Sequence, residues 1–242
     1  MRKYKDIHQA YIGVLKDVRD NYDHKCAPRD QDIREIRDYM FRIEFPIAES
    51  IVTNDQKRNK VIASYTQKEY DLYNSCSNKV EDFAEASSFW NKIQNPDGTI
   101  NSAYGFLIWE NKSFGSKFEG TLRTPWRWAV ESLIADKDSR QAFIKFSLPE
   151  HHWNGNKDQT CTMHGNFLIR DNKLHLTIIM RSNDVTLGLA YDLPWFVSLI
   201  DRMLNNLKET YPELEKGSYT HLAHSMHMYE RDADKINRMI GE

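Results

Sequence analysis

Two stretches of alternating apolar and polar residues, 166–170 and 173–181, are joined by the dipeptide Asp171-Asn172. Alternation with a period of two is typical of strands that bury one face, and a two-residue connection is typical of a β-hairpin. We therefore predict an antiparallel hairpin here. Because the apolar face of such a sheet needs a cover, the rest of the chain is expected to supply packed helices.

The remaining sequence pattern agrees with a mixture of helices and strands. Apolar residues at helical spacing predict helices over 4–20, 61–83, 123–135, 193–208 and 232–240. Further strands are predicted over 39–47, 142–146 and 218–229. Polar stretches predict loops, the second of them mobile, over 21–37 and 149–160. We predict a single α+β domain, 1–242, with a mostly antiparallel or mixed sheet and packed helices.

Charge and cysteine content narrow the classes of function. The 33 Lys and Arg and 35 Asp and Glu leave a net charge of −2, so no overall basic field would hold nucleic acid. The longest apolar runs, such as 193–200, are too short to span a bilayer, and we see no signal peptide. Cys26, Cys76 and Cys161 form no disulfide framework. We expect a cytoplasmic protein, in the host cytoplasm if the source is viral, with neither nucleic-acid nor membrane partners.

Two residues are candidates for catalysis. Cys161 stands between small polar residues directly before the predicted hairpin, where it could be a nucleophile. A single cysteine is more commonly a small buried hydrophobe, which is the alternative interpretation. Glu69 recurs with Tyr65 and Tyr73 every four residues along an apolar helical stripe. A carboxylate there is costly unless paired, so Glu69 is either a rim residue or a placed acid/base.

Two further positions could bind a substrate. Arg181 and Ser182 follow a predicted strand and could bind a phosphate through a guanidinium fork and a hydroxyl. The alternative is an ordinary surface arginine at a strand end. Asp192 stands among apolar residues just before Pro194. From these residues alone, a helix N-cap is the favoured interpretation of Asp192.

A metal site is not predicted. His221, His224 and His227 are spaced by three, but alternation over 219–229 indicates a strand. A strand sends His221 and His227 to one face and His224 to the other. No cysteine or carboxylate cluster completes a ligand set in the sequence.

Taken in order, several motifs resemble the thymidylate synthase family. Its members carry a Cys before a paired strand, then Arg-Ser-x-Asp-x-x-Leu-Gly, then a late His-x-Tyr. They also carry an Asp-x-x-Ser-Arg element and a helical Glu followed by aromatic residues. The matching residues here are Cys161, 181–188, 227–229, 136–140 and 69–73. The resemblance covers roughly residues 60–230.

Two positions separate this chain from the synthases. Synthases have Asn where Asp192 stands and His where Thr162 stands. Both changes, together with the phrase at 100–105, resemble the deoxycytidylate hydroxymethylase branch known from phages. An Asn amide matches O4 and N3–H of uracil, whereas a carboxyl group accepts from the 4-amino group of cytosine and, when protonated, donates to N3. In this context Asp192 is predicted to select cytosine rather than to cap a helix.

The resemblance implies a function. A dCMP hydroxymethylase converts dCMP, 5,10-methylenetetrahydrofolate and water into 5-hydroxymethyl-dCMP and tetrahydrofolate, a step in phage DNA modification. Cys161 would add to C6 of the base, and Glu69 would manage protons. The alternatives are a CMP or dUMP hydroxymethylase or a methylating synthase of the same family, and an inactive nucleotide-binding homologue. The presence of both Cys161 and Glu69 argues against the last, because binding alone needs neither.

The same resemblance implies a thymidylate synthase-like fold, a homodimer formed through sheet faces, and further site residues. The nucleotide would be bound by Arg181, Ser182, Asp192, His227, Tyr229, Asn166, Arg29 and, across the dimer interface, Arg140. The folate would be bound by Phe89, Trp90, Tyr104, Asp184 and Gly188. Gln141 stands in place of a second family arginine, Asn166 in place of a glutamine, and the C-terminal tail that closes over folate is expected to be short.

Overall fold

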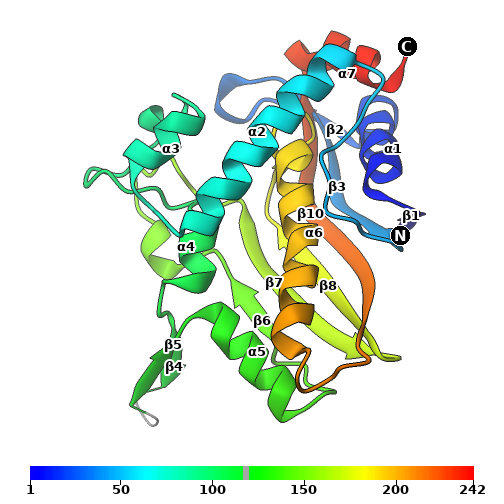
Figure 1. Ribbon diagram of the computed structural model, residues 1–242. Helices are drawn as coiled ribbons and strands as arrows, with labels where there is room; N and C mark the ends of the chain where they lie inside the picture. The colour runs from blue at the N-terminus through cyan, green and yellow to red at the C-terminus, as the bar shows by residue number, and fades with distance from the viewer. Residues whose placement is uncertain (117–119) are drawn as a thin grey trace.

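Figure 1 shows the computed structural model, which describes residues 1–116 and 120–242. In this part of the chain one mixed sheet is formed by β1 (Arg2–Tyr4), β2 (His24–Cys26), β3 (Ile33–Ile43), β6 (Phe143–Lys145), β7 (Thr162–Arg170), β8 (Lys173–Met180), β9 (Asn183–Asp184) and β10 (Glu215–Tyr229). The order is β1-β3-β10-β8-β7-β6, with β2 beside β3 and β9 beside β10. Three pairings are parallel, β1 with β3 and β10 with both β8 and β9, so the sheet is mixed. A separate small hairpin joins β4 (Phe114–Ser116) and β5 (Thr121–Arg123).

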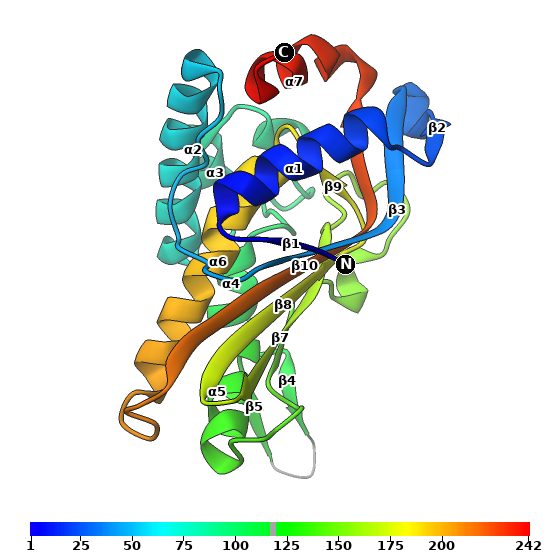
Figure 2. The ribbon, with the colours of Figure 1, turned by 90° about the vertical axis from the view of Figure 1, so that its right-hand side faces the viewer.

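The helices make the fold α+β, as predicted. The helices of the described residues are α1 (Ile7–Asp20), α2 (Gln56–Ser75), α3 (Val80–Ala86), α4 (Tyr104–Trp109), α5 (Pro125–Ala135), α6 (Gly188–Leu207) and α7 (Ala233–Ile240). Figure 2 shows α2 and α6 on the same side of the long strands β8 and β10. None of these helices is long and apolar enough to cross a membrane within the described ranges.

The predicted hairpin is confirmed and lies in the middle of the sheet. β7 and β8 pair in antiparallel register from Thr162 opposite Met180 to Arg170 opposite Lys173. Asp171 and Asn172 both have positive φ, 51° and 58°, as a type I′ hairpin turn requires. The start of β7 and the end of β8 lie at the opposite end of the hairpin from this turn, so residues 161 and 181 lie side by side.

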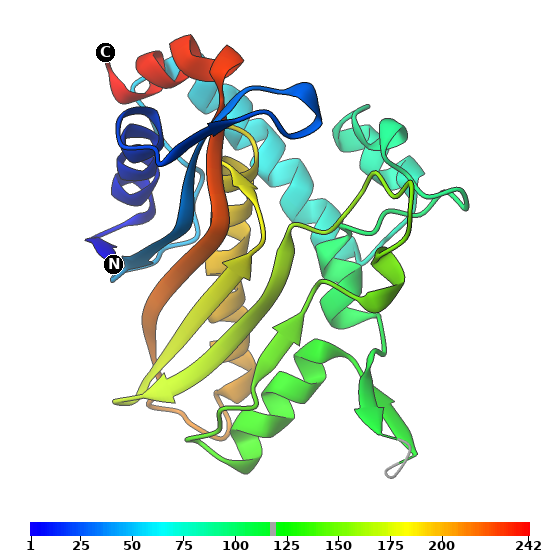
Figure 3. The same cartoon turned by 180° about the vertical axis from the view of Figure 1, so that it is seen from behind.

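In the described part of the chain, helices cover one face of the central sheet and leave the other face open. Phe167, Leu176 and Ile178 point toward them and are buried. Seen from behind, no helix lies across β10, β8 and β7 (Figure 3). Apolar residues on this other face, such as Ile179 and Leu222, are only partly buried within the single chain.

Three predicted boundaries were wrong. α6 begins at Gly188 rather than near residue 193, so Asp192 lies inside the helix and is not its N-cap. The predicted helix over 61–83 is two helices, because Cys76 adopts a left-handed conformation, with φ 58°, and ends α2. The predicted loop over 21–37 contains β2 and the start of β3, where Arg34 and Glu35 are partly buried and Arg37 is exposed.

Candidate active site

Cys161 lies at the start of β7, beside the end of β8. The backbone nitrogen of Arg181 donates to the carbonyl oxygen of Cys161 over 2.9 Å, and its Nη2 lies 3.5 Å from Cys161 Sγ. The same guanidinium donates to the carbonyl oxygens of Thr160 and Gln159 at 3.0 and 2.6 Å. Arg181 therefore holds the backbone that carries the candidate nucleophile and also faces its sulfur.

Burial and several charged groups shift the pKa of the Cys161 thiol. Burial raises the pKa of Cys161, Arg181 lowers it, and Asp192 raises it; Arg29 has a smaller lowering effect. Arg29 and Asp192 therefore act with opposite signs on the same partly buried thiol. The net shift is upward, so the free protein favours the thiol over the thiolate.

The segment that leads to Cys161 is tied to the core, although the sequence predicted a mobile loop there. Asp158 is buried and accepts hydrogen bonds from the backbone nitrogen of Ser102, at 2.8 Å, and from its hydroxyl. His151 is 5% exposed rather than solvated, and its Nδ1 lies 2.9 Å from Thr160 Oγ1. No periodicity or composition signal marked Asp158, because its partner is distant in the sequence.

Two buried carboxyl groups from different helices act on one another. Glu69 comes from α2 and Asp192 from α6, and each is less than one-tenth exposed. Burial, followed by the nearby Asp192, raises the pKa of Glu69 to about 8. Burial raises the pKa of Asp192 to about 7, against the lowering effect of a hydrogen bond from Asn183. The pair therefore holds at least one proton at neutral pH.

Thr162, the residue after Cys161, is hydrogen-bonded to Tyr104. The Thr162 hydroxyl donates to Tyr104 Oη over 2.8 Å, and both side chains are buried. Burial raises the pKa of Tyr104 well above its ordinary value, and the nearby Asp192 and Cys161 raise it further. Tyr104 thus stays protonated between the nucleophile and the carboxyl pair.

His227 and Tyr229 stand at the end of β10 that faces β9. Their rings contact edge to face, 5.5 Å between centroids, and His227 pairs with Asp184 across the sheet. Burial raises the pKa of Tyr229, Asp184 raises it further, and Arg29 lowers it. The structure therefore brings Arg29, His227, Tyr229 and Asp184 to the end of the sheet where Cys161 lies.

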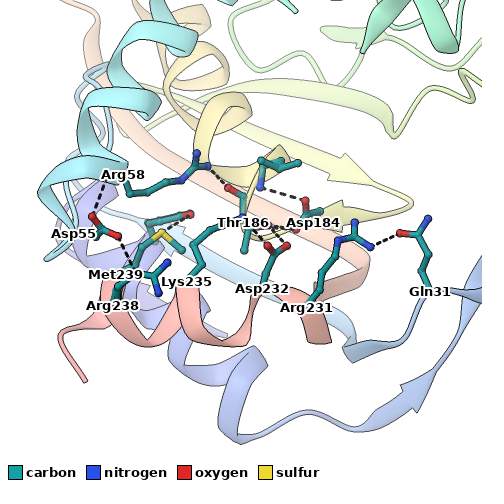
Figure 4. A network of polar contacts seen from close by, with 12 residues as sticks. Gln31, Asp55, Arg58, Asp184, Thr186, Arg231, Asp232, Lys235, Arg238 and Met239 are labelled. Carbon is teal, nitrogen blue, oxygen red and sulfur yellow. Dashed lines mark hydrogen bonds and ion pairs between the residues drawn. The ribbon is translucent and has the colours of Figure 1, made fainter. Parts of the chain in front are cut away.

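The C-terminal helix is bonded to the segment that follows Arg181 (Figure 4). Thr186 Oγ1 lies 3.0 Å from Asp184 Oδ1 and 3.1 Å from Asp232 Oδ2, and Lys235 donates to Asp232 Oδ1 at 2.5 Å. From α2, Arg58 donates to the carbonyl oxygen of Thr186 over 2.6 Å. The sequence pattern did not reveal this network, whose members are far apart in the chain.

Comparison with known proteins agrees with the geometry. The sequence model described as thymidylate synthase matches residues 9–242. The chain belongs to the thymidylate synthase family. It is therefore a one-carbon transferase of that family.

Individual relatives differ in what they act on. The chain is 29% identical, over 174 residues, to the deoxycytidylate 5-hydroxymethyltransferase of Enterobacteria phage T4, covering 69% of this chain and 67% of that protein. It is 27% identical to the deoxyuridylate hydroxymethyltransferase of Bacillus phage SP01, covering 93% of this chain and 57% of that protein. The solved thermostable thymidylate synthase A from Bacillus subtilis superposes with a TM-score of 0.70 at 20% identity, over 97% of this chain and 84% of that one. The last likeness confirms the predicted thymidylate synthase-like fold.

Two predicted nucleotide-binding residues are not brought to Cys161 within one chain. β6 pairs Phe143 with Asn166, so Arg140 lies beyond the far end of that pairing, about 25 Å from Cys161 at roughly 3.3 Å per strand residue. Asn166 lies midway along β7, where its Nδ2 donates to the carbonyl oxygen of Ala142 over 3.3 Å.

The predicted folate wall is partly exposed. The Phe89 ring is 55% exposed, and its centroid lies 5.9 Å from that of Trp90. Trp90 is buried and packs against Phe83. An exposed aromatic ring on a buried aromatic support suits a flat pterin, so the residues present fit the folate that the family uses. Ser182 is partly buried next to Arg181, and Gly188 is the first residue of α6.

Proposed function

We propose that this chain is a cytosine nucleotide hydroxymethyltransferase, converting dCMP, 5,10-methylenetetrahydrofolate and water into 5-hydroxymethyl-dCMP and tetrahydrofolate. The observation that carries this proposal is Asp192, a buried carboxyl group with a pKa raised to about 7, beside Glu69. The similarity to the phage T4 hydroxymethyltransferase supports it. When bound, the folate supplies the one-carbon unit.

Asp192 suits cytosine because it holds a proton near neutral pH. A protonated carboxyl group offers one acceptor to the 4-amino group and one donor to N3. A donor at N3 also withdraws electron density from the ring, which favours addition of a nucleophile at C6. The same group therefore contributes both to base selection and to activation.

Cys161 supplies the nucleophile. Its Sγ forms a bond to C6, and the electrons of the C5–C6 double bond move toward N3, where the Asp192 proton stabilises them. C5 becomes nucleophilic in this adduct. Because Arg181 lies 3.5 Å from Sγ, it stabilises the thiolate at the moment of attack. Departure of Sγ from C6 at the end restores the aromatic ring.

Glu69 manages the protons at C5. Its Oε2 has no hydrogen-bond partner among the described residues, and its pKa is raised to about 8. Such a carboxyl group can receive the C5 proton through an ordered water and pass it to solvent, which leaves C5 free to keep the new substituent. Thr162, in the position of the synthase histidine, bonds Tyr104 and leaves a small polar site that suits the entry of a water molecule.

The nucleotide's other groups have partners at the same end of the sheet. Arg181, Ser182 and Arg29 would hold the 5′-phosphate, and His227 and Tyr229 would bind the sugar hydroxyl. Asn166 lies too far along β7 to touch the base directly in the free chain, and its proposed part is support of the β6–β7 pairing. Phe89, Trp90, Asp184 and Gly188 would hold the folate, with Tyr104 below it.

We also propose that two chains associate through the open faces of their sheets. The face formed by β10, β8 and β7 carries the partly buried Ile179 and Leu222, which a partner would cover. The distance of Arg140 from Cys161 supports an arrangement in which Arg140 of the partner subunit reaches the phosphate. Mixing the inactive Cys161→Ser and Arg140→Ala variants should then restore about a quarter of the wild-type activity. Absence of any recovery would contradict the shared site.

Tritium release tests the reaction. [5-³H]-dCMP, CMP and dUMP are compared with and without methylenetetrahydrofolate, with Cys161→Ser as the inactive control. We expect folate-dependent release from dCMP in preference to the other two, and 5-hydroxymethyl-dCMP as the product. No release from any nucleotide would indicate a binding homologue. Release from dUMP alone would contradict the role of Asp192.

A further inference from the structure

Asn183 lies directly beside the carboxyl group that is proposed to select the base. It belongs to β9, is 2% exposed, and donates from Nδ2 to Asp192 Oδ2 over 3.2 Å. Its own Oδ1 is buried and has no hydrogen-bond partner within the described ranges. A buried amide that is only half satisfied costs stability, so packing alone does not explain its presence.

Gly188 leaves the room that this hydrogen bond needs. A Cβ atom at position 188 would lie 2.8 Å from Asn183 Nδ2 and 3.4 Å from Asp192 Oδ2. The first distance is closer than real Cβ atoms approach a neighbour. The glycine is therefore required by the space around the Asn183–Asp192 pair, in addition to any contact with folate.

We propose that Asn183 is a positioning residue that makes Asp192 select cytosine, because its N–H occupies Oδ2 and leaves the carboxyl proton on Oδ1. This inference rests on the proposed function. The carboxyl oxygen that carries no proton is the better hydrogen-bond acceptor. A donor held beside Oδ2 therefore favours the form of Asp192 whose proton lies on Oδ1. Asp192 then presents the acceptor Oδ2 to the 4-amino group and the donor Oδ1–H to N3.

Uracil would need the two oxygens of Asp192 to exchange roles. Its O4 requires a donor and its N3–H requires an acceptor. Moving the proton to Oδ2 would weaken the bond from Asn183, because a hydroxyl oxygen accepts more weakly than a carbonyl oxygen. Asn183 thus favours the arrangement that fits cytosine and opposes the one that fits uracil.

The test compares the ratio of kcat/KM for dCMP to kcat/KM for dUMP in wild type, Asn183→Ala and Asn183→Asp. A matched control, Asn205→Ala, removes an exposed amide from the outer side of α6. We expect Asn183→Ala to lower kcat/KM for dCMP about 2- to 10-fold, with a much smaller change for dUMP, as for loss of one hydrogen bond to a neutral carboxyl group. The control should leave the ratio unchanged.

Asn183→Asp keeps the side-chain shape and adds a pH signature that a packing role would not produce. At about pH 8.5 its new carboxylate has no hydrogen to donate and repels Asp192, so the preference for dCMP should be lost. At about pH 6 the protonated form can donate as the amide does, so the preference should recover. Because Asp192 itself, with a pKa raised to about 7, ionises over the same range, the ratio of each variant is divided by the wild-type ratio at the same pH.

Several outcomes would overturn the inference. Equal losses for both nucleotides in Asn183→Ala would show a structural role, and an unchanged ratio would show no role. If Asn183→Ala does not fold, the Asn183→Asp variant tests the proposal instead. A dCMP preference that is insensitive to pH in Asn183→Asp contradicts the proposal. Failure of the proposed function is separate, because it would appear as absence of dCMP turnover in the wild type.

Discussion

Glu69 and Asp192 form one carboxyl pair in the molecule, and Asp184 and Asp232 form another, close to the same turn after β9. The second pair is fully bonded: Asp184 accepts from the backbone nitrogens of Thr186 and Leu187, and both oxygens of Asp232 have partners (Figure 4). In the first pair, Glu69 Oε2 has no partner among the described residues.

The difference separates a structural use of carboxyl groups from a chemical one. Fully bonded carboxylates stabilise the turn and attach α7 to it. Incompletely bonded, buried carboxyl groups hold protons near neutral pH and leave lone pairs for a ligand. Changes in the first pair should therefore affect turnover, and a change at Asp232 in the second pair should affect mainly stability.

The largest effect is expected for Glu69→Gln. Loss of a general acid/base should lower kcat for dCMP by about 10²–10⁴-fold. Stability should change little or rise, because the substitution removes a desolvated ionisable group. Asp71→Asn, on the exposed side of the same helix, is the control. Steady-state kinetics together with urea unfolding test this, and a large loss of stability with kcat retained would reverse the assignment of the two pairs.

A smaller effect, on stability, is expected for Asp232→Asn. The change weakens the bonds to Thr186 and Lys235 and should lower the free energy of unfolding by about 1–3 kcal/mol. The exposed Asp234 on the same helix supplies the control, Asp234→Asn. Chemical denaturation measures the loss. If kcat fell a hundredfold while stability stayed constant, Asp232 would belong with the chemical pair instead.

The third effect is a pH dependence of stability, which of these two pairs only the first should produce. Burial raises the pKa of Glu69 to about 8 and of Asp192 to about 7. Between the ordinary carboxyl pKa of about 4 and these values, the folded state binds more protons than the unfolded chain, so stability falls as pH rises. Each group contributes at most about 1.4 kcal/mol per pH unit.

Unfolding free energies of the ligand-free protein from about pH 5 to about pH 8 reveal this slope. Glu69→Gln should flatten it, whereas Asp232→Asn should shift the whole curve without changing its slope. Identical slopes in wild type and Glu69→Gln would mean that Glu69 is ionised throughout the window.

The sequence could predict the parts of the site that local patterns encode. Alternation and the Asp171-Asn172 turn predicted the hairpin that places Cys161 beside Arg181, and this was confirmed. The four-residue recurrence of Glu69 among aromatic residues left two interpretations open, a rim residue or a placed acid/base, and the structure shows that Glu69 is buried.

Contacts between distant segments could not be predicted in the same way. The bond from Asn183 to Asp192 depends on where β9 lies against α6, and the bond from Asp158 to Ser102 joins segments with no shared pattern. The true start of α6 was missed because Pro194 suggested a first turn. Instead, the helix accommodates Pro194 in its interior, where the helix loses one backbone hydrogen bond.

The central claim, addition of Cys161 to a cytosine nucleotide held by Asp192, is tested most directly by trapping the adduct. 5-Fluoro-dCMP carries fluorine in place of the hydrogen that must leave C5, so the covalent complex should accumulate in the presence of methylenetetrahydrofolate. Peptide mass spectrometry is expected to show nucleotide and folate on the peptide that contains Cys161, and no adduct in Cys161→Ser. An adduct formed with 5-fluoro-dUMP but not with 5-fluoro-dCMP, or one attached at Cys26 or Cys76, would contradict the account.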